Sequence, residues 1–214
     1  MISQPASGRR TPTLWETKLA ADPGHSRWYI ERFRGLVADG MDIVGEGRTI
    51  DAMLARGSRV LDAGCGFGRV GGYLASVGHT VVGVDVDPTL IEAATEDHPN
   101  ATWLVGDLAE LDLSARGIPE KFDAIVCAGN VLPFAAPGTQ GAVLSRFAAH
   151  VTPGGRVVVG FGTDREYAVT SFLADIEASG LTPELLLATW DLVPYRDGAD
   201  FIVAILRRIG VAAD

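Results

Sequence analysis

The sequence predicts a doubly wound α/β domain built on a mostly parallel β-sheet, and three observations carry that prediction. From about residue 57 onward, short apolar runs alternate with segments of helical periodicity. Gly64, Gly66 and Gly68 directly follow the first apolar run, where a parallel sheet makes room for a ligand at the end of its first strand. The length of 214 residues, 47% of them apolar, fits one domain with a sizeable core.

Five strands are expected in the first part of this alternation, because each is a short run rich in apolar or β-branched residues. These strands cover residues 59–63, 80–86, 102–105, 122–128 and 156–161. The helices expected between them cover residues 69–77, 88–96 and 140–150. Pro88 suits the first turn of the second of these helices.

The last part of the chain is expected to close the sheet in the opposite direction. A helix at residues 167–179, ended by Gly180, precedes two strands at residues 184–190 and 201–208. The connection between those strands, residues 191–200, is too short for a crossover helix. We therefore expect these two strands to pair antiparallel at one edge of the sheet.

The first fifty residues do not follow the alternation. Residues 28–37 and 49–56 have the spacing of amphipathic helices. We therefore divide the chain into an N-terminal helical extension or lid, residues 1–44, and a main ligand-binding domain, residues 45–214.

The charge and the cysteines exclude several classes of function. The net charge is −9, and Lys and Arg do not cluster beyond two adjacent pairs, so we expect no nucleic-acid partner. The two cysteines lack metal-ligand spacing, which predicts no metal site and a reducing, cytoplasmic location. No apolar run approaches the roughly 20 residues of a membrane span, and the N-terminus does not resemble a signal peptide. The sequence does not predict an oligomeric state.

Three aspartates stand where successive predicted strands end, namely Asp62, Asp85 and Asp107. Their convergence at one edge of the sheet suits a ligand with hydroxyls, an amine and a positive centre. Asp85 lies 21 residues after Gly64, the spacing at which a carboxylate accepts hydrogen bonds from both hydroxyls of a ribose. Asp107 suits the exocyclic amine of adenine, whereas Asp62 is expected to hold the glycine loop from below.

Five motifs in the same order resemble those of the class I S-adenosylmethionine-dependent methyltransferases. They read VLDAGCGFG at 60–68, VVGVDVDP at 81–88, VGDLAELDL at 105–113, FDAIVCAGNVL at 122–132 and VTPGGRVVV at 151–159. The resemblance covers about residues 45–208 and is greatest to the small-molecule type found in actinobacteria. It implies a Rossmann-like, seven-stranded sheet with the last strand antiparallel, and S-adenosylmethionine as cofactor.

The resemblance also distributes the cofactor over the chain. It implies that the methionine moiety lies near Asp62, Gly64 and Gly66, and the ribose at Asp85. It implies adenine between Val86 and the pair Asp107 and Leu108, and Asn130 facing the sulfonium. Three further residues are candidates on their position alone: Tyr29, Cys65 and Arg69.

Each of these three candidates has more than one interpretation. Cys65 is expected to contribute its backbone N–H rather than a nucleophilic thiol. Arg69 either meets the ligand carboxylate or is exposed to solvent. Tyr29 either contacts the cofactor or packs between helices.

The catalytic residue is not predicted, because methyl transfer from a sulfonium depends mainly on positioning and needs a base only when the acceptor holds its proton. The polar and aromatic residues near the expected site are His25, Trp28, Phe134, Arg165, Tyr167, Trp190, Tyr195 and Arg196. We expect His79, which lies at the opposite end of the sheet, to be structural.

The predicted function is transfer of a methyl group to an unidentified small molecule. One alternative is a protein that binds S-adenosylmethionine without catalysis. A second is an NAD(P)-dependent oxidoreductase, because residues 66–71 also satisfy G-x-G-x-x-G. Asp62 disfavours that alternative, since its charge would lie beside a pyrophosphate. A third, aminopropyl transfer, is disfavoured because residues 129–139 contain no Asp or Glu.

Overall fold

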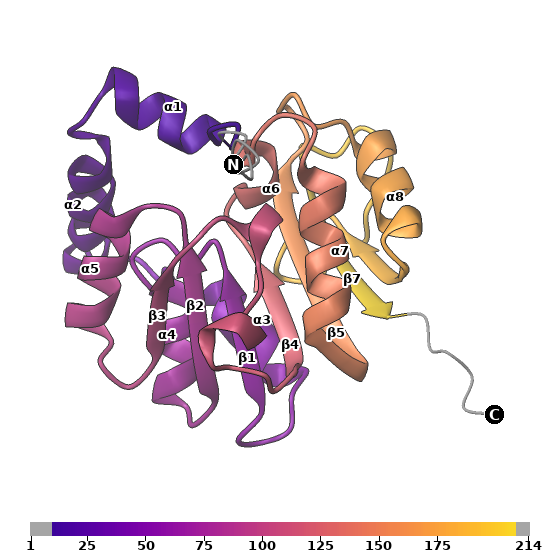
Figure 1. Cartoon of the computed structure of the whole chain (residues 1–214), viewed down its shortest axis with the longest axis horizontal. Helices are drawn as coiled ribbons and strands as arrows, with labels where there is room; N and C mark the ends of the chain where they lie inside the picture. The colour runs from indigo at the N-terminus through magenta and orange to yellow at the C-terminus, as the bar shows by residue number, and fades with distance from the viewer. Residues whose placement is uncertain (1–9, 209–214) are drawn as a thin grey trace, which may run out of the picture.

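The computed structural model describes residues 10–208, so residues 1–9 of the predicted extension and 209–214 of the predicted main domain lie outside it. Its centre is a seven-stranded sheet in the order β3-β2-β1-β4-β5-β7-β6 (Figure 1). The strands are β1 (Arg59–Ala63), β2 (Thr80–Asp85), β3 (Thr102–Val105), β4 (Phe122–Cys127), β5 (Val151–Gly162), β6 (Leu181–Leu187) and β7 (Phe201–Arg208). Strands β1 to β5 pair in parallel, and β7 runs antiparallel to both β5 and β6.

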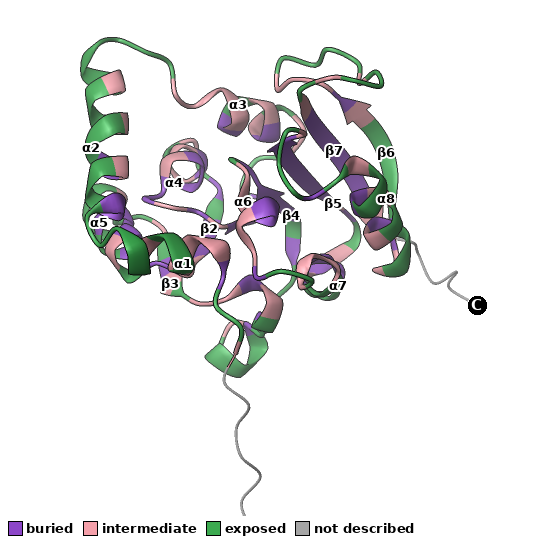
Figure 2. Ribbon diagram, turned by 90° about the horizontal axis from the view of Figure 1, so that it is seen from above, coloured by how far each residue is buried: buried purple, intermediate pink, exposed green. Residues whose placement is uncertain are grey.

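Helices cover both faces of the sheet. The α-helices are α1 (Leu14–Ala21), α2 (His25–Ala38), α3 (Gly45–Ala52), α4 (Arg69–Ser76), α5 (Pro88–Asp97), α6 (Val131–Phe134), α7 (Gln140–His150) and α8 (Val169–Ala178). The short 3-10 turns η1 (Leu108–Glu110) and η2 (Ser114–Arg116) connect β3 to β4. Seen from above in Figure 2, α3 and α4 lie on one side of the sheet and α7 and α8 on the other.

The core lies on the two faces of the central strands. Phe147 of α7 and Phe172 of α8 are fully buried against one face, and Leu74 of α4 against the other. Val60 and Leu61 of β1 face opposite sides and are both fully buried. This two-sided burial explains why the central strands read as continuous apolar runs rather than as alternating ones.

The predicted sheet is confirmed, and the differences are local. Strand β5 begins at Val151, five residues earlier than expected, because the register shifts between Phe122 and Ala124 and the bulge accommodates the Pro-Gly-Gly sequence. Strand β6 covers Leu181–Leu187 rather than residues 184–190. The sequence did not predict α1 or α6, and α6 is only four residues long.

The strand order reverses at β1, which lies between β2 and β4. The carboxyl ends of the parallel strands meet there, and this crevice is where open α/β sheets bind ligands. Helix α1 crosses above this end of the sheet, with α2 beside it (Figure 1). No helix among residues 10–208 combines the length and the apolar character needed to cross a membrane.

Candidate functional site

A cavity of about 750 Å³ lies at the carboxyl ends of the parallel strands. Its floor comes from the loops after β1 to β4, and α1 and α2 form its roof. The sequence-predicted residues in its wall are Tyr29, Gly64, Gly66, Arg69, Asp85, Val86, Asp107, Leu108 and Asn130. The structure therefore gathers nine of the eleven predicted binding residues around one space, while the side chains of Asp62, which ends β1, and Cys65, within the glycine loop, are buried outside the cavity wall.

The glycine loop presents bare backbone to this cavity. Gly64, Gly66 and Gly68 all have φ in the left-handed region, at +78°, +55° and +86°. A Cβ on Gly64 would lie 2.4 Å from the side chain of Val131. A Cβ on Gly66 would instead make an ordinary van der Waals contact, 3.9 Å from the ring of Tyr29. The loop therefore brings bare backbone close to the cavity, with the N–H of Gly64 bonded to the carbonyl of Val84 and the N–H of Gly66 bonded to Asp85.

Asp62 supports this loop from inside the protein. Its side chain is buried, and its Oδ2 accepts a hydrogen bond of 2.7 Å from the backbone N–H of Gly71 in α4. Burial raises the pKa of Asp62 to about 7. The carboxyl group thus fixes the first turn of the helix that follows the glycine loop, rather than facing the large cavity.

Asp85 ends β2 and does face the cavity. Its two oxygens accept hydrogen bonds of 2.9 Å from the backbone N–H groups of Gly66 and Asp87. These bonds fix the carboxylate and leave the remaining lone pairs of both oxygens for a ligand. Burial raises the pKa of Asp85 to about 6, so its charge is sensitive to mildly acidic pH.

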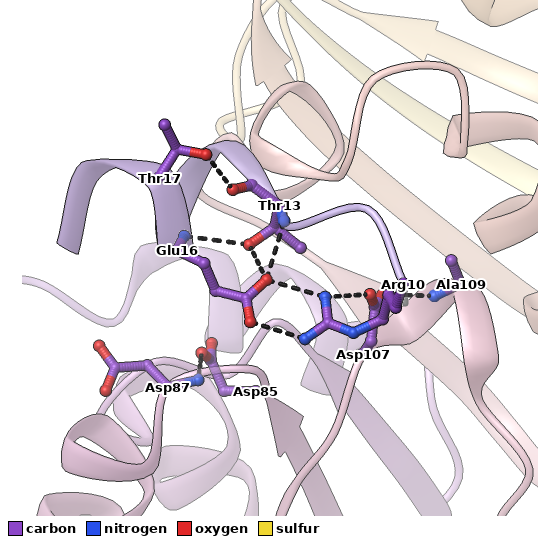
Figure 3. A network of polar contacts seen from close by, with 8 residues as sticks. All are labelled: Arg10, Thr13, Glu16, Thr17, Asp85, Asp87, Asp107 and Ala109. Carbon is purple, nitrogen blue, oxygen red and sulfur yellow. Dashed lines mark hydrogen bonds and ion pairs between the residues drawn. The ribbon is translucent and has the colours of Figure 1, made fainter. Parts of the chain in front are cut away.

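Asp107 is held by the N-terminal segment, as Figure 3 shows. Its Oδ1 accepts a hydrogen bond from the N–H of Ala109, and its Oδ2 lies 2.8 Å from Nη1 of Arg10. Arg10 also pairs with Glu16 of α1 at 2.6 Å, and this hydrogen bond lowers the pKa of Glu16 to about 2. Arg10 was not a predicted site residue, although it now occupies an oxygen expected to meet the adenine amine.

Asp87, which caps α5 at the bottom of the cavity, hydrogen-bonds to both N-terminal helices, α1 and α2. Its buried carboxylate accepts hydrogen bonds from Nε1 of Trp15 in α1, at 2.9 Å, and from the hydroxyl of Ser26 in α2. It also caps α5 through the N–H of Thr89. The sequence shows Asp87 only as a helix cap before Pro88, and nothing local reveals partners more than sixty residues away.

The structure decides between the alternatives that the sequence left open for Arg69, ligand contact or solvent exposure, and for Tyr29, cofactor contact or helix packing. The guanidinium of Arg69 lies 2.6 and 2.7 Å from the carboxylate of Glu46 in α3, and its side chain is only 14% exposed. The solvent-exposed interpretation of Arg69 is therefore wrong. Tyr29 both lines the cavity and packs against Trp15 and Phe67, with ring centroids 5.7 and 6.0 Å apart.

Asn130 and Cys65 are the last two residues of the predicted binding site. Asn130 has a left-handed φ of 68° and accepts a 2.7 Å hydrogen bond from the N–H of Gly162, which ties the end of β4 to the end of β5. Cys65 is buried, and burial raises the pKa of its thiol well above the usual value. A protonated, buried thiol is not a nucleophile, as expected, but the backbone N–H expected to serve the ligand is bonded to the carbonyl of Val84 instead.

The residues considered for catalysis separate into two groups. Those in the cavity wall are His25, Trp28, Phe134, Arg165 and Trp190. Those outside it are Tyr167, Tyr195 and Arg196.

Two side chains outside the cavity have structural partners instead. The expectation that Tyr167 lies near the site is wrong. Its hydroxyl donates a 2.7 Å hydrogen bond to Asp175 of α8, and its side chain does not line the cavity. His79 is structural as expected, with its Nε2 2.8 Å from a carboxylate oxygen of Asp51.

Comparison with known proteins identifies relatives of this chain. The family described as "Methyltransferase domain" matches residues 60–155. A solved TehB-like SAM-dependent methyltransferase from Corynebacterium glutamicum is 44% identical, with 87% of this chain and 100% of that chain covered and a TM-score of 0.83. The magnesium protoporphyrin IX methyltransferase of Synechocystis, solved with bound SAM, shares the fold at 20% identity, with 86% of this chain and 80% of that chain covered and a TM-score of 0.57.

The curated relatives act on different kinds of substrate. An 18S rRNA (guanine-N(7))-methyltransferase of Bos taurus is 30% identical over 56% of this chain and 41% of its own length. A dTDP-3-amino-3,6-dideoxy-alpha-D-glucopyranose N,N-dimethyltransferase of Streptomyces fradiae is 30% identical over 59% of this chain and 53% of its own length. This chain therefore spans about half the length of these relatives, and their substrates differ from one another.

Proposed function

The chain belongs to the class I S-adenosylmethionine-dependent methyltransferases, and we propose that it transfers the methyl group to a small molecule. The observation that carries the proposal is the cavity at the carboxyl ends of the strands. Helices α1 and α2 line one side of it (Figure 2), and its volume is about 750 Å³. A space of this size suits a cofactor together with a small acceptor.

The charge of the protein supports the same choice. The net charge is −9, which opposes association with a phosphate backbone. Several arginines, moreover, are already paired with carboxylates: Arg10, Arg34, Arg48, Arg59, Arg69 and Arg156. The rRNA-methylating relative is thus a weaker guide to the substrate than the sugar-methylating one.

The residues present fit S-adenosylmethionine. We propose that its methionine part packs against the bare backbone of the glycine loop at Gly64 and Gly66, and that Asp85 accepts hydrogen bonds from its ribose. Val86 and Leu108 would enclose the adenine, with Asp107 at its amine and Asn130 near the sulfonium. When bound, the cofactor supplies an activated methyl group on a positively charged sulfur.

The chain itself then supplies position. Rigid placement of two reactants can account for roughly 7–11 kcal/mol of a reaction barrier. Asn130 fixes the β4 end of the site through the hydrogen bond that it accepts from Gly162. In this proposal residues 1–44 are the lid and residues 45–214 the methyltransferase domain. We further propose a cytoplasmic location, because Cys65 and Cys127 are both free.

Calorimetric titration with S-adenosylhomocysteine and with NAD tests the cofactor site. We expect saturable binding of S-adenosylhomocysteine, none of NAD, and a large loss of affinity in Asp85→Asn. Incubation with S-adenosylmethionine labelled in the methyl group then tests the substrate class, with a metabolite extract and total RNA as separate acceptors. Label in the metabolite fraction supports the proposal, and label confined to RNA contradicts it. Binding without any transfer favours a non-catalytic cofactor-binding protein.

A further inference from the structure

Aromatic rings surround the part of the cavity between the lid and the end of β4. Trp15 stands at their centre, with ring centroids 5.2 Å from His25, 5.7 Å from Tyr29 and 6.0 Å from Phe134. Phe134 belongs to α6, the helix that directly follows Asn130. These faces and edges suit a planar ring, which stacks on aromatic side chains at such distances.

The carboxylates in the cavity wall are already engaged by partners. Asp42 is paired with Arg48 of α3, and Glu46 is paired with Arg69 of α4. Asp85 and Asp107 accept hydrogen bonds from backbone N–H groups, and Asp107 also pairs with Arg10. Hydrogen bonds from their arginines lower the pKa of Asp42 and Glu46, so these two are poor proton acceptors, whereas burial raises the pKa of Asp85, which is already assigned to the ribose. The wall also contains positive charge, since Lys18, Arg32 and Arg165 reach it. Among the ion pairs of residues 10–208, none involves Lys18 or Arg32.

His25 is the one imidazole in the wall of this cavity, as far as the described residues go. It is only 9% exposed and lies between Trp28, stacked at 5.1 Å, and Trp15. Its Nδ1 is 3.7 Å from Oδ2 of Asp22, the carboxylate just before α2. The flanking rings restrict the plane of the imidazole, and since Nδ1 is the nitrogen nearest Asp22, Nε2 is the nitrogen assigned to a ligand in the proposal below.

We propose that the acceptor is a planar aromatic molecule methylated on an ionisable oxygen, and that His25 accepts the proton of that oxygen. This proposal rests on the proposed methyltransferase function. The acceptor oxygen forms a bond to the methyl carbon, while the carbon–sulfur bond breaks and its electron pair stays on sulfur. The hydroxyl proton passes to Nε2 of His25 and from there to solvent. The products are an aryl methyl ether and neutral S-adenosylhomocysteine.

The positive wall supports an oxygen rather than an amine as the acceptor. In this proposal Lys18, Arg32 and Arg165, which line the cavity, stabilise the negative charge that develops on a phenol-like oxygen as its proton leaves. An amine that entered as a cation would meet the same positive charges, while Asp42 and Glu46 are already paired with Arg48 and Arg69.

The test uses 4-nitrophenol as probe and 4-nitroaniline as its matched control, which has the same ring without an ionisable oxygen. The protein is first saturated with S-adenosylhomocysteine, and absorbance is followed at a pH below the pKa of free 4-nitrophenol. We expect saturable binding with the spectrum of the nitrophenolate in the wild type. The variant His25→Asn should bind the probe with the spectrum of the neutral phenol. The variant His150→Asn, in α7 outside the cavity, should match the wild type.

Two results overturn the proposal. One is the absence of saturable binding of 4-nitrophenol, and the other is an equal nitrophenolate fraction in wild type and His25→Asn. With S-adenosylmethionine in place of the product, labelled 4-nitroanisole should form, and methylation of 4-nitroaniline alone contradicts the proposal. Calorimetric binding of S-adenosylhomocysteine separates the two levels of inference. If it persists while the probe fails, only the acceptor assignment is wrong, and if it is lost, the proposed function itself fails.

Discussion

The indole nitrogen of Trp15 donates a 2.9 Å hydrogen bond to the carboxylate of Asp87, which lies 72 residues further along the chain. The backbone N–H of Asp87 in turn donates to Oδ1 of Asp85, the proposed ribose ligand. One short loop therefore carries both the carboxylate proposed for the cofactor and the residue that holds helix α1. We expect ordering of the N-terminal helices and ordering of this loop to be coupled through these bonds.

Removal of one lid anchor should weaken cofactor binding. In Ser26→Ala the buried carboxylate of Asp87 loses a hydroxyl donor, which costs roughly 1–3 kcal/mol for an under-satisfied charged group. We expect a lower melting temperature and a several-fold higher dissociation constant for S-adenosylhomocysteine by calorimetry. The control is Ser76→Ala, whose hydroxyl contacts only the carbonyl of Tyr73 at the exposed end of α4. Equal affinity in both variants would refute the coupling.

Cofactor affinity should depend on pH through Asp85. Burial raises the pKa of Asp85 to about 6, so the carboxylate that accepts ribose hydroxyls is lost as pH falls below that value. We expect the affinity for S-adenosylhomocysteine to fall by up to about tenfold per pH unit there. Asp85→Asn should bind weakly across the same range with a flat profile. A wild-type profile as flat as that of the variant would contradict the assignment.

Asp62 should make the apo protein less stable as pH rises. Its pKa is about 7 in the folded state, well above the roughly 3.9 of an unfolded chain. The folded state therefore holds a proton that the unfolded chain releases, and this contribution to stability is complete below about pH 4 and is lost as pH rises to about 7. Urea unfolding of wild type and Asp62→Asn should show the variant gaining relative stability over that range, by up to about 4 kcal/mol. A constant difference between the two proteins would show that Asp62 does not titrate there.

Two glycines with the same backbone conformation should respond differently to alanine. Gly64 and Gly129 both have positive φ, so each substitution costs roughly 1–2 kcal/mol of backbone strain. The new Cβ meets Val131 at 2.4 Å in Gly64→Ala but has open space in Gly129→Ala. Overpacking adds roughly 1–3 kcal/mol, so Gly64→Ala should be the less stable protein in urea unfolding. Equal free energies of unfolding would mean that the loop relaxes around the added methyl group.

The central strands could be predicted from the sequence because they are buried on both faces. Val60 and Leu61 of β1 are buried on opposite faces, so this strand reads as apolar at adjacent positions rather than at alternating ones. The aspartates at the strand ends were visible for the same reason, since each interrupts such a run. Strand β5 was shortened in the prediction because Pro153 and Gly154 usually end a strand, and here they lie in a bulge.

The lid could not be predicted in the same way. Helix α1 has no buried residue and no apolar stripe, and its only local signal is the capping box between Thr13 and Glu16. The partners that tie the lid down, Asp87 for Trp15 and Asp107 for Arg10, are distant in sequence. Such contacts have no local pattern, because they depend on the folded sheet to bring the two segments together.

A crystal structure with S-adenosylhomocysteine bound tests the central claim most directly. We expect both ribose hydroxyls to lie within hydrogen-bond distance of the Asp85 carboxylate. We expect the sulfur to face the space between Asn130 and the lid. A ribose held elsewhere, with Asp85 bonded only to the amides of Gly66 and Asp87, would contradict it.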